Sequence, residues 1–161
     1  MHYFIFPTQD SWISSGSDTI TGESFKDQNF GSDQILELKK NFFNDNFDHQ
    51  TRTLINFEGT NFNIVSQSIV DGDIPTDAKF FLKVFEAQGN SDLSSEYNLH
   101  IQPISESWTE GTGKFQDNPK TTNGCSWKNR SNPIGGAEVA WETQGATVLD
   151  VSSSVQSFSL E

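Results

Sequence analysis

Apolar and polar residues alternate over short stretches along most of this chain, as expected for β-strands that are buried on one face. The clearest examples are residues 34–39, 52–57 and 98–104. A longer apolar run spans residues 78–85, and its Phe-Phe pair and the β-branched Val84 favour a strand buried on both faces. Further strands are expected at residues 3–6, 11–13, 138–141 and 146–151.

Turn-forming residues separate these stretches. Polar segments rich in Gly, Asn, Asp or Ser lie at residues 14–18, 29–33, 44–48 and 71–75. A helix competes in two places only, at residues 61–70, which are weakly periodic, and at residues 152–160, where one short turn fits. About eight short strands with turns between them predict an all-β fold, an antiparallel β-sandwich or jelly roll, made by a single domain over residues 1–161.

Composition and charge narrow the possible functions. Of 161 residues, 33% are apolar, and 14 Phe and 4 Trp are prominent among them, which suits the thin core of a sandwich. The formal net charge is −12, so we expect neither nucleic acid nor an anionic membrane as a partner. The first residues lack a basic region and a long apolar stretch, and we therefore expect no signal peptide and no membrane-inserted segment.

The residues that could carry catalysis are not arranged for it, and we expect that the chain is not an enzyme. Glu106 and Glu110 flank Trp108, as a pair of glycosidase carboxylates would, but such pairs usually come from different strands. A structural role is therefore the favoured interpretation of both acids. The histidines show no zinc-ligand spacing, and Cys125, the single cysteine, is expected in the core.

Calcium is the one cofactor that the sequence leaves open. Asp71 and Asp73 flank a glycine in one polar loop, and Asp45 and Asp48 lie in another. Neither loop has the twelve-residue pattern of a helical calcium-binding hand. Solvated turns are the alternative interpretation of both pairs, and no other cofactor is expected.

Two tryptophans bracket a polar segment rich in Gly, Thr and Asn that cannot form a helix. We expect an ordered loop over residues 105–133, here called the contact loop, that is braced by Trp108 and Trp127. The candidate binding residues are Trp12, Trp108, Glu110 and Trp127. The tryptophan rings would stack on sugars or anchor a protein interface, whereas the alternative interpretation places these rings in the core.

Short motifs follow one another in a set order over residues 10–156. They are Asp10-Ser-Trp-Ile13, Asn29-Phe-Gly31-Ser-Asp33, Arg52-Thr-Leu-Ile-Asn-Phe57, Ile74-Pro75 with the run 78–85, Ser107-Trp-Thr-Glu-Gly111, Gly124-Cys-Ser-Trp127 and Asp150-Val-Ser-Ser-Ser-Val155. In this order they resemble the DNRLRE-type β-sandwich module. That family occurs in secreted cell-surface proteins, in some carbohydrate-binding modules and in structural proteins of tailed bacteriophages.

The resemblance implies a non-enzymatic structural or adhesive role in a virion, as a capsid decoration, neck, tail or fibre component. Such a protein would be assembled in the host cytoplasm in many copies, beside other virion proteins. The alternative is a carbohydrate-binding module, with or without calcium, for bacterial or algal polysaccharide. Because the family continues beyond its Asp-Val-x-x-x-Val element, we expect either a fragment or a sheet edge completed by a neighbour.

Overall fold

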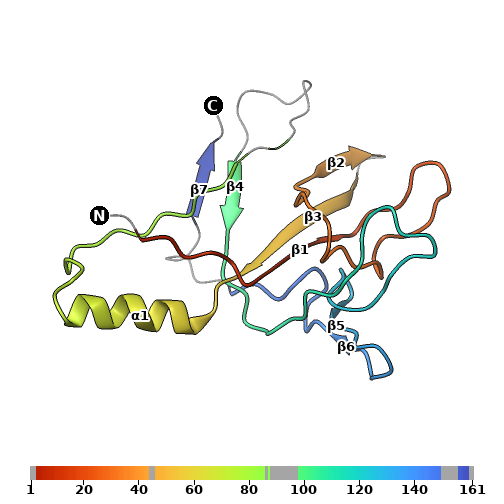
Figure 1. Ribbon diagram of the computed structural model, residues 1–161. Coiled ribbons are helices and arrows are strands. Elements are labelled where there is room, and N and C mark those ends of the chain that lie inside the picture. The colour runs from red at the N-terminus through yellow and green to blue at the C-terminus, as the bar shows by residue number, and fades with distance from the viewer. Residues whose placement is uncertain (1–2, 44–45, 86, 88–97, 150–155, 160–161) are drawn as a thin grey trace.

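The computed structural model describes residues 3–43, 46–85, 87, 98–149 and 156–159, and strands are the commonest regular element in it (Figure 1). The elements in chain order are β1 (Gln9–Ser14), β2 (Lys40–Phe43), β3 (Asn46–Asn56), α1 (Gly59–Val70), β4 (Asn98–Ile101), β5 (Asn129–Ser131), β6 (Val139–Ala140) and β7 (Gln156–Ser159). The chain is thus rich in β-structure, with short antiparallel sheets.

The largest sheet has the strand order β1-β3-β2 and is antiparallel throughout. β1 pairs with β3 along its whole length, beginning with Gln9 opposite Asn56. This pairing confirms the strands predicted at residues 11–13 and 52–57. β2 and β3 follow one another in the chain and lie side by side in the sheet.

Two further sheets contain two strands each, β4 with β7 and β5 with β6. β4 confirms the first part of the strand predicted at residues 98–104, and β6 confirms the centre of that predicted at residues 138–141. In place of the strand predicted at residues 146–151, the described part of that stretch forms an isolated bridge from Val148 to Ile104.

The weakly periodic stretch at residues 61–70 is helical and belongs to α1. The helix buries Val65 alone and exposes Phe62, Ile64 and Val70. It lies apart from the strands in Figure 1, and it packs against no other element of the described chain. The described helix is not long and apolar enough to cross a membrane. The helical turn expected at 152–160 is wrong for residues 156–159, which form β7, and its other residues lie outside the described ones.

The core lies where the sheet of β1 and β3 meets the second half of the chain. Five buried residues form it, namely Ile13, Leu54, Cys125, Trp141 and Ala146. The indole Nε1 of Trp141 donates a hydrogen bond of 2.8 Å to the carbonyl oxygen of Ser126, so this ring is buried with its polar atom satisfied. The prediction that Cys125 belongs to the core is confirmed.

Three predicted strands are not formed. Residues 3–6, 34–39 and 78–85 pair with no other strand of the described chain. The prediction for residues 78–85 is also wrong on burial, because Phe80 is 65% exposed and Phe81 is 84% exposed. Alternation and β-branched residues report a local preference for extended backbone, whereas a stable strand also needs a neighbour for its hydrogen bonds.

Candidate functional site

The side chain of Asn29 organises the contact loop. It is fully buried, and its Nδ2 donates hydrogen bonds to the carbonyl oxygens of Glu110 (2.6 Å) and Cys125 (2.7 Å). Its Oδ1 accepts from the N–H groups of Gly31 (3.1 Å) and Gly113 (2.8 Å). Both amide hydrogens and both lone pairs are thereby used, and one side chain joins segments that are far apart in the sequence.

Two glycines allow the backbone to come this close to Asn29. Gly111 has a φ of +82° and Gly124 a φ of +98°, in the region that side-chain-bearing residues rarely adopt. A β-carbon on Gly111 would overlap the Asn29 amide and the carbonyl oxygen of Asn123. One on Gly124 would overlap the backbone of Gly111. The contact loop therefore closes only with glycine at these two positions.

A stack of aromatic rings lies beside this loop. Trp12 of β1 stacks on Phe30 with ring centroids 3.7 Å apart and an angle of 12° between the planes. The indole Nε1 of Trp12 donates a hydrogen bond of 3.0 Å to Asp33. Phe115 of the contact loop extends the group, with its ring centroid 6.2 Å from that of Trp12 and 5.6 Å from that of Phe25. Phe115 is 50% exposed, so the stack reaches solvent there.

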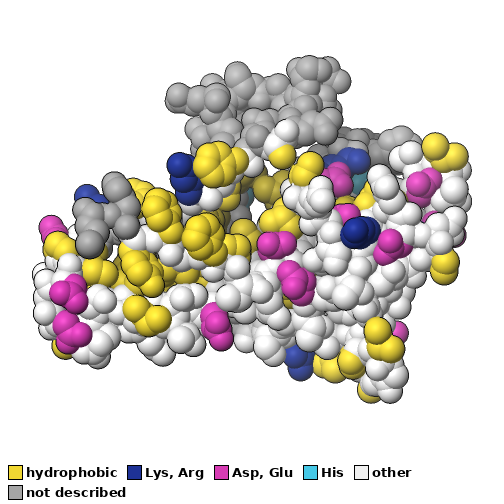
Figure 2. Space-filling model, viewed as in Figure 1, with side chains coloured by type: hydrophobic (Ala, Val, Ile, Leu, Met, Phe, Trp, Pro, Cys, Tyr) yellow, Lys and Arg dark blue, Asp and Glu magenta, His cyan; other side chains and the backbone are white. Residues whose placement is uncertain are grey.

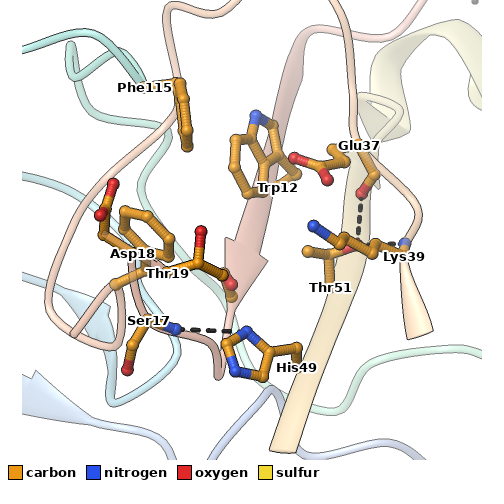
Figure 3. Close-up of a pocket in the computed structure, with 11 residues that line it drawn as sticks. Trp12, Ser17, Asp18, Thr19, Glu37, Lys39, His49, Thr51 and Phe115 are labelled. Carbon is orange, nitrogen blue, oxygen red and sulfur yellow. Dashed lines mark hydrogen bonds between the residues drawn. The ribbon is translucent and has the colours of Figure 1, made fainter. Parts of the chain in front are cut away.

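A hollow of about 150 Å³ opens next to the stack (Figure 3). Trp12, Phe25 and Phe115 contribute its aromatic lining. Polar side chains from the first turn, from the segment before β2 and from β3 also line it, and they include Ser17, Asp18, Glu37, Lys39, His49 and Thr51. The hollow thus combines ring surface with hydrogen-bonding groups, which is the general composition of a small-molecule site.

Glu37 and Lys39 both line this hollow (Figure 3). Within the described residues, neither the carboxylate nor the ammonium makes a hydrogen bond or an ion pair. Their backbone is fixed by Thr51, whose hydroxyl donates to the carbonyl oxygen of Glu37 (2.8 Å) and accepts from the N–H of Lys39 (2.5 Å). The hollow therefore offers an acceptor and a donor side by side on a held segment.

Two polar groups on the other side of the hollow already have hydrogen-bond partners. The Asp18 carboxylate accepts hydrogen bonds from the N–H groups of Thr21 (2.7 Å) and Ile20 (2.8 Å), and these bonds lower its pKa. His49 Nδ1 accepts from the N–H of Ser17 at 3.4 Å.

The predicted tryptophans lie in packed positions. Trp12 is 3% exposed, and it is the one of the three that lines the hollow. Trp108 and Trp127 are half-buried against the core. The guanidinium of Arg52 lies 5.3 Å from the ring centroid of Trp127, and burial lowers the pKa of this arginine. Both rings thus pack against the core at the two sides of the polar segment, and their bracing role stays a prediction.

The two acids near Trp108 hold the contact loop in place. A carboxylate oxygen of Glu110 accepts a hydrogen bond of 3.0 Å from the N–H of Asp10, at the start of β1. Glu106 lies 3.6 Å from the Arg130 guanidinium and accepts from the N–H of Glu142 at 3.2 Å. Both carboxylates therefore join backbone segments, as the structural interpretation of these acids expects.

The thiol of Cys125 is fully buried, and burial raises its pKa to about 11. It stays protonated at neutral pH and is a poor nucleophile there.

The calcium candidates that the structure describes, Asp71 and Asp73, gather no ligand set. Within the described residues, no group of three or more His, Cys, Asp or Glu side chains is placed to hold a metal ion. Asp71 accepts a hydrogen bond of 2.8 Å from Gln67, and Asp73 is exposed in the turn that follows α1. Asp45 and the side chain of Asp48 lie outside the described residues.

Sequence reasoning missed the residues that contribute most to this region. Asn29 was expected in a turn, but three of its four partners, in Glu110, Gly113 and Cys125, lie in segments that no local pattern connects to it. Glu37 and Lys39 are two residues apart in an alternating stretch, which places both on the same side of an extended chain. That spacing is the one signal by which they could have been found.

Comparisons with known proteins supply no family for this chain. No family model matches it, and neither a curated protein nor a solved structure does.

Proposed function

We propose that this chain is a non-enzymatic structural module of a multi-subunit particle, and that the particle is a bacteriophage virion. The observation that carries the proposal is a large exposed apolar surface. Phe4, Phe6, Phe80, Phe81 and Phe85 are each at least 65% exposed. Figure 2 shows hydrophobic side chains gathered on one side of the molecule, over α1 and the segments that run above it in Figure 1.

The extent of this surface favours a subunit over a free monomer. With about 150–250 Å² for each fully exposed aromatic side chain, the five phenylalanines alone expose on the order of 700 Å². Monomeric proteins rarely have an apolar patch above about 300–600 Å², whereas a stable interface buries about 800 Å² on each partner. A neighbouring subunit would remove this surface from water.

The contact loop provides the second element of the proposal. Its backbone is held by Asn29 and braced by half-buried rings, so its exposed polar side chains would keep their positions without a ligand. A rigid surface of this kind binds with little loss of conformational freedom. Repetition of the module in a particle would add many weak contacts together. The β-sandwich or jelly-roll arrangement implied by the resemblance remains part of this proposal.

Immunogold electron microscopy tests the virion assignment. Antibodies raised against the purified chain are applied to particles of the phage whose genome carries the gene. We expect gold at one repeated position on the particle, for example on the neck, tail or capsid surface. Absence of label on intact and on partly disrupted particles contradicts the virion assignment.

The hollow favours a second candidate function, the binding of a neutral saccharide. The ring of Phe115 and the free charges of Glu37 and Lys39 offer an apolar face beside an acceptor and a donor, the combination that a sugar ring requires. Titration with bacterial and algal polysaccharides, with and without calcium, tests this candidate by calorimetry. Binding that Glu37→Gln and Phe115→Ala both abolish supports it, and an absence of binding contradicts it.

A further inference from the structure

Residues 78–85 have the features of a strand that lacks a partner. Among described residues, the backbone hydrogen bond made by this run is the one from the Ala78 N–H to the carbonyl oxygen of Pro75, at its beginning. In an extended chain, Phe80, Leu82 and Val84 share one face. All three are exposed large apolar residues. The run therefore presents free backbone groups together with an apolar face.

The opposite face of the run alternates between cations and rings. It carries Lys79, Phe81, Lys83 and Phe85, and the Lys83 ammonium lies 4.9 Å from the ring centroid of Phe85. Asp77 comes directly before the run, in the turn that the hydrogen bond from Ala78 to Pro75 closes. This order of charges and rings limits which strand fits opposite the run.

Antiparallel pairing of the run with its own copy brings complementary residues together. In the register that sets Phe80 opposite the Phe80 of the second copy, Lys79 faces Phe81 and Ala78 faces Leu82. The flanking Asp77 then faces Lys83, twice in the dimer because the arrangement is two-fold symmetric. Opposite charges, cation–ring pairs and aromatic pairs directly across an antiparallel ladder are each favourable.

We propose that two copies of this chain associate through residues 78–82, which pair antiparallel about a two-fold axis at Phe80. The proposal rests on the structural role proposed above and names the contact by which the module assembles. The pairing satisfies the free N–H and C=O groups of an exposed extended segment, which otherwise invites non-specific association. It also covers the central part of the apolar surface, whose extent approaches that of a stable interface.

A charge-swap experiment on the full chain tests both the pairing and its register. The dimer dissociation constant is measured by sedimentation equilibrium for the wild type, Asp77→Lys, Lys83→Asp and the double variant. Each single change places like charges opposite one another at both symmetric positions, and we expect dissociation constants raised about tenfold or more. The double variant restores opposite charges, and its constant should return to within about threefold of the wild type.

Net charge provides an internal control. Asp77→Lys makes the chain less acidic and Lys83→Asp makes it more acidic, so general repulsion would move the two dissociation constants in opposite directions. Lys128→Asp changes the net charge as Lys83→Asp does, but at an exposed pair with Asp27. It should leave the dissociation constant within about twofold of the wild type. Circular dichroism verifies that every variant is folded.

Several outcomes would overturn the proposal. A wild-type chain that stays monomeric at all concentrations would overturn it. An oligomer whose dissociation constant is unchanged by the single substitutions would also overturn it. Failure of the double variant to restore association rejects the register and with it the two-fold pairing. The virion assignment is tested separately by the immunogold experiment. Labelled particles together with a monomeric chain would support the structural role and reject the pairing. A dimer without labelled particles would support the pairing and reject the virion assignment.

Discussion

Residues 105–128 and residues 78–85 are both without regular strands or helices, yet the two segments differ completely in how they are held. The first is poor in large apolar residues, and the buried amide of Asn29 fixes it through three hydrogen bonds. The second is the most apolar run in the chain and is exposed. Apolar content alone therefore does not place a segment in a core, whereas a single satisfied polar group can fix a polar loop.

The same substitution in the two regions gives the sharpest test of this difference. Phe30 is fully buried beneath Trp12, and Phe30→Ala should lower the free energy of unfolding by about 3–5 kcal/mol. Phe81 is 84% exposed, and Phe81→Ala should change it by no more than about 0.5 kcal/mol.

Urea denaturation measures both values, at a protein concentration low enough that association contributes little. Equal losses in the two variants would mean that residues 78–85 are packed within the monomer, and the contrast between the regions would disappear.

Removal of the Asn29 amide should come next in size. Asn29→Ala leaves two carbonyl oxygens and two N–H groups without their partner in a buried place, and we expect a loss of about 2–4 kcal/mol. Asn132→Ala is the matched control, because its Nδ2 makes one exposed hydrogen bond, to the carbonyl oxygen of Thr122 at 2.9 Å, and should cost less than about 1 kcal/mol.

Hydrogen exchange adds a local measurement to the urea curves. Exchange at the N–H groups of Gly31 and Gly113 should accelerate in Asn29→Ala, since both donate to the missing amide. A stability loss as small as that of Asn132→Ala would show that the contact loop is held by other contacts.

The sequence predicts the local preferences of this chain better than its long-range contacts. The strand character of residues 11–13 and 52–56, the core position of Cys125 and the helical periodicity of residues 61–70 follow from alternation, burial preference and periodicity, whereas the pairing of β1 with β3 does not. Residues 78–85 have an equally clear strand pattern, but no pattern within the run says whether a second strand lies beside it.

The candidate site is less predictable for the same reason. The bracing roles predicted for Trp108 and Trp127 come from their positions at the two sides of a polar segment, and the structure packs both rings against the core. The part played by Asn29 depends on carbonyl oxygens 81 and 96 residues away, and the hollow depends on four separate segments. Such contacts arise from the tertiary structure, and local patterns in a single sequence do not reveal them.

The thiol of Cys125 gives a smaller effect with a defined pH dependence. Burial raises its pKa in the folded chain to about 11 from an ordinary value of 9.0. The folded state favours the protonated thiol. The contribution of this thiol to the free energy of unfolding is therefore fully present below pH 9 and is lost as the pH rises towards 11. The free energy of unfolding should therefore fall over this window, and Cys125→Ala should remove that part of the fall.

Thiol labelling verifies the same burial independently. A thiol-specific reagent at pH 8 should react slowly with the folded chain and quickly in urea. Rapid labelling of the folded chain would mean that the core around Cys125 opens readily, together with the part of the contact loop that contains this residue.

The smallest expected effect concerns Asp117 in the contact loop. Its carboxylate accepts hydrogen bonds from the Thr121 hydroxyl (2.6 Å) and the Lys114 N–H (2.9 Å), and these bonds lower its pKa. Because the pKa is lower in the folded chain, the ionised carboxylate stabilises the fold at any pH above the ordinary pKa of an aspartate. This stabilisation is lost as the pH falls through the pKa of Asp117 in the folded chain. Thr121→Val removes the larger cause and should raise the pKa of Asp117, as measured by NMR titration of its carboxyl carbon. Thr122→Val, at the exposed neighbouring residue, is the control and should leave the pKa of Asp117 unchanged. If Thr121→Val also left this pKa unchanged, the loop would not hold Asp117 and Thr121 together in solution.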